Sequence, residues 1–233
     1  MMKKYPKITL LLVTALVLSA CSNSSKTDWD LYELNGKVKT YLESYFEPVQ
    51  KFGEWQTGKP QEFGNYSVTF TEDGTYKQMD FFEKNNKLRE RVIAKQENGK
   101  VVEELKYNED GDFRGKTSYT YLSDTKVEFV SYDENGEEIA MGKTYLKDGK
   151  IVRREFKTLY NGRIEYELRV KFMYDANGRS TAIEQSYGEG ESKTTKFEYL
   201  EFDKQNNWTK RLDFVDDNTE TPEKIVTRTY EYY

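Results

Sequence analysis

Apolar and polar side chains alternate along much of the chain. Between residues 164 and 174 one set of alternate positions is wholly apolar, namely Ile164, Tyr166, Leu168, Val170, Phe172 and Tyr174. The positions between them carry Glu165, Glu167, Arg169 and Lys171, with Met173 as the one interruption. A period of two places successive side chains on opposite faces and so indicates a half-buried β-strand. The same alternation is visible in Phe113, Thr117, Tyr119 and Tyr121, and in Val101, Leu105 and Tyr107 with Glu103 as an exception.

Turn sequences separate these segments at short intervals. They are Asp73-Gly74, Asn85-Asn86, Asn98-Gly99, Asp110-Gly111, Ser123-Asp124, Asn135-Gly136, Asp148-Gly149, Asn161-Gly162 and Asn177-Gly178. Asn-Gly and Asp-Gly pairs tolerate the positive φ angles of tight hairpin turns. We therefore expect about thirteen strands from Asn65 to Tyr233. One more strand is expected over Gly36 to Phe46, with Val38, Thr40, Leu42, Ser44 and Phe46 in register.

Strands joined by tight turns must be antiparallel. The predicted fold class is therefore all-β, a long antiparallel β-meander of about 13–14 hairpin-linked strands. Its accumulated twist should curl the sheet, partly close it, or split it into two packed layers. Residues 47–64 are expected to form one long irregular connection, because Pro48, Gly53, Gly58 and Pro60 interrupt them. A short helix is weakly indicated over Trp29 to Leu34.

A repeated motif gives a resemblance to a known family. Tyr174-Asp175-Ala176-Asn177-Gly178-Arg179 resembles the YD repeat of Rhs-type proteins, and the segments beginning at Tyr107 and Tyr132 are looser copies. The ending from Asn207 to Tyr233 is similar to small YD-repeat-like lipoproteins of Bacteroides-type bacteria. The resemblance covers residues 36–233 and implies a hairpin-repeat fold and an envelope location. It implies no particular activity, because most of those lipoproteins have no assigned function.

The first twenty residues have the layout of a secretory signal. Lys3, Lys4 and Lys7 precede an apolar run from Ile8 to Leu18, which is followed by Leu18-Ser19-Ala20-Cys21. Small residues before a lone cysteine resemble the lipobox of bacterial lipoproteins. That resemblance implies cleavage after Ala20 and lipidation of Cys21, and Ser22 implies forwarding to the outer membrane where one exists. We expect residues 1–20 to be a cleaved signal, 21–33 a lipidated cysteine with a flexible tether, and 34–233 one β domain.

Charge and composition limit the classes of partner that are expected. Loss of the signal would leave 33 basic and 41 acidic residues, with the two signs interleaved along the chain. A nucleic-acid partner is therefore not expected, because binding a phosphate backbone needs clustered basic residues. Aromatic residues make up 15% of the chain, which is too many for a disordered protein. Tyrosine, with nineteen copies, suits strands whose side chains have an apolar body and a polar tip.

Catalytic chemistry is poorly supported. The chain has no histidine, and lipidation would consume its single cysteine. These two facts exclude His-activated nucleophiles and the usual zinc ligand sets. No catalytic residue, metal site or cofactor is predicted. Asn108, Asp110 and Asp112 could suggest calcium, but Phe113 stands where an EF-hand-like loop needs glycine, so a hairpin turn is the better interpretation.

A membrane-spanning barrel is also disfavoured. Strands of nine to eleven alternating residues are typical of such barrels, but their lipid-facing side must stay apolar. The segment from Lys100 to Asn108 would place Glu103 on one face and Glu104 and Lys106 on the other.

The aromatic stripes are expected to form a core mainly, with part of them open as a groove. Candidate binding aromatics are Trp55, Trp208, Tyr166, Phe172 and Tyr174. The function predicted is a lipid-anchored, non-catalytic interaction or scaffold module of the cell envelope, attached to the membrane and binding an unidentified protein or glycan partner. Two alternatives are kept: a glycan-binding surface lipoprotein and, less favoured, a carboxylate-dependent hydrolase.

Overall fold

The computed structural model describes residues 27–62, 64–188, 190 and 192–233. The predicted signal and Cys21 lie outside these residues. One short helix, α1 (Asp28–Leu31), precedes fifteen strands. The strands are β1 (Val38–Lys51), β2 (Glu54–Pro60), β3 (Tyr66–Phe70), β4 (Tyr76–Phe82), β5 (Leu88–Glu97), β6 (Lys100–Asn108), β7 (Phe113–Ser123), β8 (Lys126–Asp133), β9 (Glu138–Lys147), β10 (Lys150–Tyr160), β11 (Arg163–Tyr174), β12 (Ser180–Tyr187), β13 (Ser192–Phe202), β14 (Trp208–Val215) and β15 (Lys224–Tyr232).

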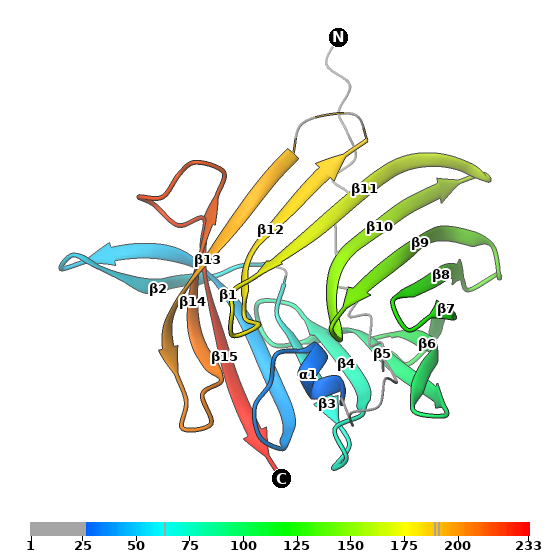
Figure 1. The fold of residues 1–233 in the computed structure, drawn as a ribbon, viewed down its shortest axis with the longest axis horizontal. Coiled ribbons are helices and arrows are strands. Elements are labelled where there is room, and N and C mark those ends of the chain that lie inside the picture. The colour runs from blue at the N-terminus through cyan, green and yellow to red at the C-terminus, as the bar shows by residue number, and fades with distance from the viewer. Residues whose placement is uncertain (1–26, 63, 189, 191) are drawn as a thin grey trace.

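The sheet is an antiparallel meander that closes on itself. From β3 to β15 each strand pairs with the next along the chain, and β1 pairs with both β3 and β15. The result is a 14-strand β-barrel, with β2 paired to the second half of β1 (Figure 1). The predicted all-β antiparallel meander is thus confirmed. The sheet closes more completely than the curled or partly closed form expected from the sequence.

β2 corrects the expectation of an irregular connection over residues 47–64. β1 runs on through Pro48 to Lys51 and turns at Phe52 and Gly53, both at positive φ. Trp55 on β2 then pairs with Gln50 of β1. Proline is tolerated here because Pro48 and Pro60 lie where the hairpin leaves the barrel wall, so their missing N–H groups break no barrel ladder.

Bulges near the strand starts explain the closure. One extra residue interrupts the ladder near the start of many strands, including Lys77 in β4, Val102 in β6, Val152 in β10, Thr181 in β12 and Thr209 in β14. A bulge bends its strand and increases the local twist. Repeated along the meander, these bends curl the sheet until β15 meets β1.

Side chains from the following strand satisfy the carbonyl groups beside these bulges. Tyrosine hydroxyls donate to carbonyl oxygens in four places: Tyr121 to Val101 (3.1 Å), Tyr174 to Ile151 (2.8 Å), Tyr199 to Ser180 (2.7 Å) and Tyr230 to Trp208 (2.7 Å). Gln96 Nε2 donates in the same way to Tyr76, at 2.6 Å. The tyrosine content of the chain therefore has a structural use, since each ring packs inside the barrel while its hydroxyl meets a buried carbonyl.

The turns of the Tyr-Asp segments share one hydrogen-bond pattern. The Asp175 carboxylate accepts from the backbone N–H groups of Asn177 and Arg179, both at 2.9 Å. Asp133 accepts similarly from Asn135 and Glu137. Asn108, considered above as a calcium ligand, uses its side-chain oxygen to accept from its own turn. This side chain therefore has the turn role expected of an Asx residue.

Bulges also correct two predicted strand faces. In β6 the extra residue reverses the alternation, so that Val101 and Glu104 are both buried in the barrel while Leu105 is not. In β1 a shift after Val38 places Tyr41 and Glu43 inside, instead of Leu42 and Ser44. Each extra residue moves the following side chains to the opposite face.

The barrel is filled unevenly. Apolar side chains from β3 to β9 form a core with Leu34 and Val38, and Trp29, Leu31 and Tyr32 pack against it. Trp29, Leu31 and Tyr32, which fall in the segment expected to be a tether, thus pack against this core. A second, smaller cluster of Leu212, Phe214 and Ile225 lies on the outside of β14 and β15, covered by Phe46 and Trp55 of the β1–β2 hairpin.

Residues 28–35 close one end of the barrel, and we call them the plug. The Asp28 carboxylate accepts from the Tyr76 N–H at 2.7 Å, and Trp29 Nε1 donates to the Val38 carbonyl at 2.7 Å. Across the opening, Glu33 accepts from the Ser180 N–H at 2.9 Å. Asn35 and Asn207 exchange two hydrogen bonds, at 2.7 and 2.8 Å. The plug is thus fixed to strands on opposite sides of the barrel, as its position in Figure 1 also shows.

Candidate ligand site in the barrel lumen

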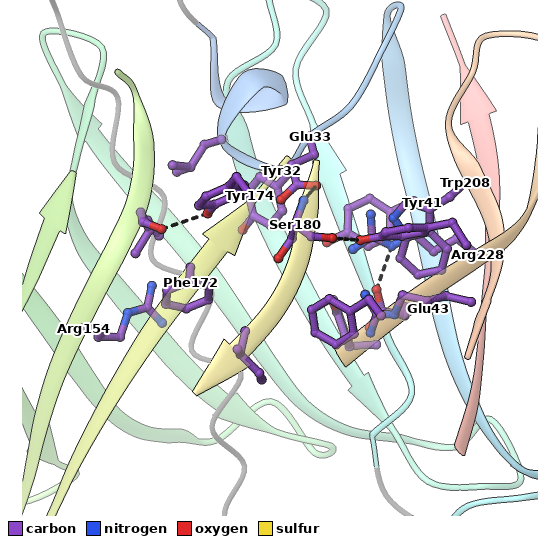
Figure 2. A pocket seen from close by; sticks show the side chains of 17 residues that line it. Tyr32, Glu33, Tyr41, Glu43, Arg154, Phe172, Tyr174, Ser180, Trp208 and Arg228 are labelled. Carbon is purple, nitrogen blue, oxygen red and sulfur yellow. Dashed lines mark hydrogen bonds and ion pairs between the residues drawn. The ribbon is translucent and has the colours of Figure 1, made fainter. Parts of the chain in front are cut away.

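A cavity of about 270 Å³ lies inside the barrel beside the plug. Its floor is formed by Leu31, Tyr32 and Glu33, and its walls come from β1, β3 and β10 to β15. Figure 2 shows its lining, which combines aromatic rings, arginines and carboxylates; the wall residues are Tyr41, Glu43, Tyr66, Ile151, Arg154, Phe172, Tyr174, Ser180, Ile183, Phe197, Tyr199, Trp208, Arg211 and Arg228. The strand alternation therefore directs polar and charged groups, as well as apolar ones, into the lumen.

Two of the three arginines are held by carboxylates on neighbouring positions. Arg211 Nε donates to Asp213 Oδ1 at 2.6 Å and its Nη2 donates to Oδ2 at 3.2 Å. Arg228 Nε donates to Glu43 Oε2 at 2.6 Å. The Arg228 and Arg211 guanidinium groups, together with the Tyr45 hydroxyl, hold the pKa of Glu43 below its usual range even though burial alone would raise it. The Glu43–Arg228 pair is therefore ionised inside the barrel.

Both guanidinium groups lie close to the indole of Trp208. Arg228 Cζ is 4.2 Å and Arg211 Cζ is 4.8 Å from the ring centroid. Arg211 also lies 4.1 Å from the centroid of Phe197, and Arg228 lies 4.5 Å from that of Tyr41. Cations over aromatic faces attract the ring quadrupole more strongly where water is excluded. These stacks orient the two arginines and fix one wall of the cavity.

Arg154 stands on the opposite wall, on β10. Its side chain is buried, and desolvation is the main cause that lowers its pKa. Its electrostatic neighbours are Tyr119, Glu104, Tyr32 and Tyr174. Glu104 is the carboxylate among them, and it is buried too, accepting a 2.5 Å hydrogen bond from the Tyr119 hydroxyl. Burial raises the pKa of Glu104 to about 7, so this carboxyl group carries only part of a negative charge near neutral pH.

The cavity continues toward the end of the barrel opposite the plug. A second hollow of about 330 Å³ shares Ile183, Phe197 and Arg211 with the first. It is lined on the far side by Lys193, Glu223 and Lys224, near the β12–β13 and β14–β15 connections. The two hollows therefore adjoin each other along β12 to β14.

The five predicted binding aromatics separate into two groups. Phe172, Tyr174 and Trp208 line the inner cavity, although Trp208 is only 4% exposed. Tyr166 lies farther along β11, with its ring 5.7 Å from that of Tyr187. Trp55 lies outside the barrel, where it packs on Leu212, Phe214 and Ile225 and its carbonyl accepts from Lys210 Nζ. The two tryptophans do not share a site, and Cys21 lies outside the described residues.

Sequence reasoning did not identify the charged lumen. Arg154, Arg211, Arg228, Glu43 and Glu104 all stand in strands where charged residues occur on both faces. The inward position of Glu43, Glu104, Arg154 and Arg211 follows bulges in their own strands, which the alternation pattern does not reveal. One available signal was the run from Arg211 to Asp213, in which two opposite charges two residues apart must share a face of a strand.

The described residues contain no group of three or more carboxylate, cysteine or histidine side chains arranged to hold a metal ion. Within the same ranges, no helix is long and apolar enough to span a membrane.

Comparisons with known proteins give likenesses in structure only. No family model matches the chain, and no curated protein matches it. Among solved structures, a porin-like protein from Bacteroides vulgatus ATCC 8482 is 13% identical with a TM-score of 0.49, covering 83% of this chain and 98% of that one. A porin-like protein from Bacteroides uniformis ATCC 8492 is 9% identical with a TM-score of 0.44, covering 84% and 98%. A chain of the TcdB2-TccC3-Cdc42 structure is 9% identical with a TM-score of 0.29, covering 81% of this chain and 12% of that one. The evidence for the barrel is therefore the strand pairing of this chain, in which β15 closes on β1.

Proposed function

We propose that this protein is a lipid-anchored, non-catalytic binding protein of the cell envelope, whose barrel holds a small ligand in its lumen. The observation that carries the proposal is the inner cavity, which is closed on one side by the plug and lined by convergent aromatic and charged groups. Binding sites for small molecules are typically apolar hollows with a few well-placed polar groups. The chain's lack of histidine supports binding rather than catalysis.

The lipid anchor is proposed from the lipobox-like sequence before Cys21. The plug begins at Asp28, seven residues after this cysteine. At most about 3.5 Å per residue, that segment spans about 25 Å when extended. An acylated Cys21 would therefore hold the plugged end of the barrel near a membrane, with the opposite end farther from it.

The outer face of the barrel supports attachment by lipid rather than insertion of the strands. Oppositely charged side chains face each other across adjacent strands: Asp80–Arg91 (2.7 Å), Lys95–Glu103 (2.7 Å), Glu128–Lys143 (2.9 Å), Lys157–Glu167 (2.8 Å) and Lys171–Glu184 (2.8 Å). These pairs run from β4 to β12. A lysine or arginine on the lipid side costs about 2–4 kcal/mol at the bilayer midplane. A surface with such pairs is suited to water.

Replacing the acylated residue tests the anchor and the water-facing surface together. We expect the full chain with its signal to incorporate labelled palmitate and to sediment with membranes. Cys21→Ser should lose the label and appear in the soluble fraction with an unchanged β-sheet circular dichroism spectrum. Cys21→Ala, which removes the same nucleophile, should behave in the same way. Retention of folded Cys21→Ser in membranes after a carbonate wash would contradict the proposal.

Native mass spectrometry tests ligand binding. Residues 22–233, incubated with a small-molecule extract of envelopes and desalted, should retain a defined added mass at one copy per chain. Trp208→Phe changes the cavity wall, whereas Trp55→Phe changes an aromatic residue outside the barrel and serves as the matched control. The proposal is contradicted if no mass is retained, or if Trp55→Phe abolishes retention and Trp208→Phe leaves it intact.

A further inference from the structure

We infer that a pocket at the plugged end of the barrel binds a phospholipid headgroup that carries a phosphate next to a primary amine, as in phosphatidylethanolamine. This inference rests on the lipid-anchor part of the proposed function, which places the plugged end near a membrane. It concerns a site other than the lumen. It is based on two basic side chains that aromatic rings hold in place and on carboxylates in the same pocket.

The pocket has a volume of about 310 Å³, and we call it the rim pocket. The plug residues Asp30, Glu33 and Leu34 line it together with Trp208, the start of β10 and the β11–β12 turn. The β9–β10 and β11–β12 turns lie beside α1 in Figure 1. Leu34 and Trp208 are buried whereas Asp30 is exposed, so the rim pocket reaches the surface of the protein.

Two basic side chains, Lys150 and Arg179, line the rim pocket. Lys150 Nζ lies 5.3 Å from the ring centroid of Tyr174. Arg179 Cζ lies 4.4 Å from the ring centroid of Phe202. A Cβ atom on Gly178 would stand 3.2 Å from Lys150 Nζ, so this ammonium group lies against the β11–β12 turn, one residue before Arg179. The rings orient both cations, because a cation over an aromatic face is attracted by the ring quadrupole.

Neither cation forms an ion pair with a carboxylate in the part of the chain that the structure describes. Lys157 and Lys171 on the outer face differ in this respect, since each pairs with a glutamate of the next strand at 2.8 Å. A guanidinium group presents a planar set of N–H donors that matches a phosphate group, and an ammonium group adds a compact positive charge. Lys150 and Arg179 together therefore suit a phosphate group.

The carboxylates of the rim pocket indicate a ligand with both charges. Glu33 accepts from the Ser180 N–H at 2.9 Å, and Asp30 Oδ2 accepts from the Thr27 N–H at 2.9 Å. An ionised carboxylate can accept several hydrogen bonds, so the exposed Asp30 can also accept from a ligand. A primary ammonium group has N–H donors for this carboxylate, whereas the trimethylammonium group of phosphatidylcholine has none. A phosphate next to a primary amine thus matches the lining better than phosphate alone.

The position of the rim pocket decides the source of the headgroup. The proposed anchor at Cys21 would hold the plug within about 25 Å of a membrane surface. Because the rim pocket is partly formed by the plug, the phosphate esters nearest to it are the headgroups of that membrane. The proposal therefore commits to a membrane lipid as the ligand.

Vesicle sedimentation tests the inference. Residues 22–233 lack Cys21, so their binding to vesicles does not depend on acylation. Vesicles of phosphatidylcholine are compared, at one salt concentration, with vesicles in which part of that lipid is replaced by phosphatidylethanolamine. This replacement should raise the partition coefficient by about ten-fold, because the primary amine adds charge-assisted hydrogen bonds. An equal share of phosphatidylglycerol, which has the phosphate without the amine, should give a smaller increase.

Variants locate the effect in the rim pocket. Lys150→Met and Arg179→Met should each remove most of the increase caused by phosphatidylethanolamine, and Lys150→Arg should retain it. Lys126→Met is the matched control. Lys126 follows the β7–β8 turn at the same end of the barrel and lies 5.9 Å from the Tyr145 ring centroid, but it does not line the rim pocket. Its replacement should leave binding unchanged, and all variants should keep the circular dichroism spectrum of the parent chain.

Three results would overturn the inference. They are equal partition, or none, with the phosphatidylcholine and phosphatidylethanolamine vesicles, an equal or larger increase with phosphatidylglycerol, and an equal loss of binding in Lys126→Met and Lys150→Met. Each of these results would leave the anchor and the lumen site standing, because the palmitate and mass-spectrometric experiments test those separately.

Discussion

Glu43 on β1 and Arg228 on β15 face each other directly in the strand pair that closes the barrel, and their side chains are joined by a 2.6 Å hydrogen bond. Both side chains are almost fully buried, with 4% and 10% of their surfaces exposed. The barrel seam is thus marked by an ion pair inside the lumen as well as by backbone hydrogen bonds.

Removing one partner of this ion pair should lower the stability of the fold. Arg228→Met leaves the Glu43 carboxylate buried without its counter-charge, so we expect the free energy of unfolding to fall by about 3–5 kcal/mol. The double variant Glu43→Gln/Arg228→Met should recover part of that loss, because neither charge of this pair remains. Urea denaturation measures both values. Glu43→Gln alone is measured as well. If the double variant loses at least as much unfolding free energy as the two single variants lose together, the ion pair does not have this role.

Glu104 should make stability depend on pH. Its pKa is raised from 4.5 to about 7 in the folded protein, so folding favours the protonated form. Its contribution is therefore fully present below about pH 4.5 and is lost as the pH rises through 7. Beyond that pH the ionised form should cost about 3 kcal/mol. The groups facing it are Tyr76, Tyr119 and Arg154, with Lys106 also contributing.

Glu104→Gln should remove this pH dependence. The unfolding free energy of the variant, measured by urea titration from pH 5 to 8, should fall less with rising pH than that of the parent chain. Glu103→Gln is the control, because Glu103 is the adjacent carboxylate but faces outward to Lys95 and Lys116. A variant profile parallel to the parent profile would show that Glu104 is already ionised at low pH.

Gly142 leaves space for two phenylalanine rings. It lies on β9 opposite Phe129 on β8 and Phe156 on β10, whose rings stack with centroids 6.0 Å apart. A Cβ atom here would stand 2.4 Å from the Phe129 ring and 2.1 Å from the Glu155 carbonyl oxygen. Gly142→Ala should therefore destabilise the fold by about 3 kcal/mol. Gly99→Asn, in a turn with nothing within 4 Å, should cost less than about 1 kcal/mol in the same denaturation assay.

The plug should loosen when Asn207 is truncated. Its side chain exchanges two hydrogen bonds with Asn35 and donates a third to the Tyr232 hydroxyl. Asn207→Ala should increase amide hydrogen exchange at residues 31–35 by ten-fold or more, while β6 to β9 stay protected. Asn135→Ala, in an exposed turn away from the plug, should change neither region. Unchanged exchange at residues 31–35 in Asn207→Ala would show that Asp28, Trp29 and Glu33 are sufficient to hold the plug.

The sequence predicted the regular part of this fold well and the irregular part poorly. Turn pairs such as Asn98-Gly99 and Asp148-Gly149 predicted where strands end. Both residues of each pair have positive φ in the structure, which Asn, Asp and Gly tolerate better than other residues. The alternation in β11 predicted the inward positions of Leu168 and Val170. Closure was not predictable, since it depends on bulges at residues such as Val102, whose sequence does not differ from ordinary strand sequence. The same bulges turn Glu104 inward, so the charged lumen was missed for the same reason.

The pairing of β1 with β15 has a consequence for how the chain folds. The β1–β15 pairing joins residues 38–46 to residues 225–232, so it can form only after both ends of the chain are present. Synthesis delivers the N-terminal end first, so β1 has only β3 and β2 as partners until the last strand arrives. Contacts between such distant segments slow folding. Assembly of the seam should therefore be the final and slowest step of folding, and chains that stop before β15 should expose two unpaired sheet edges that can join with other copies.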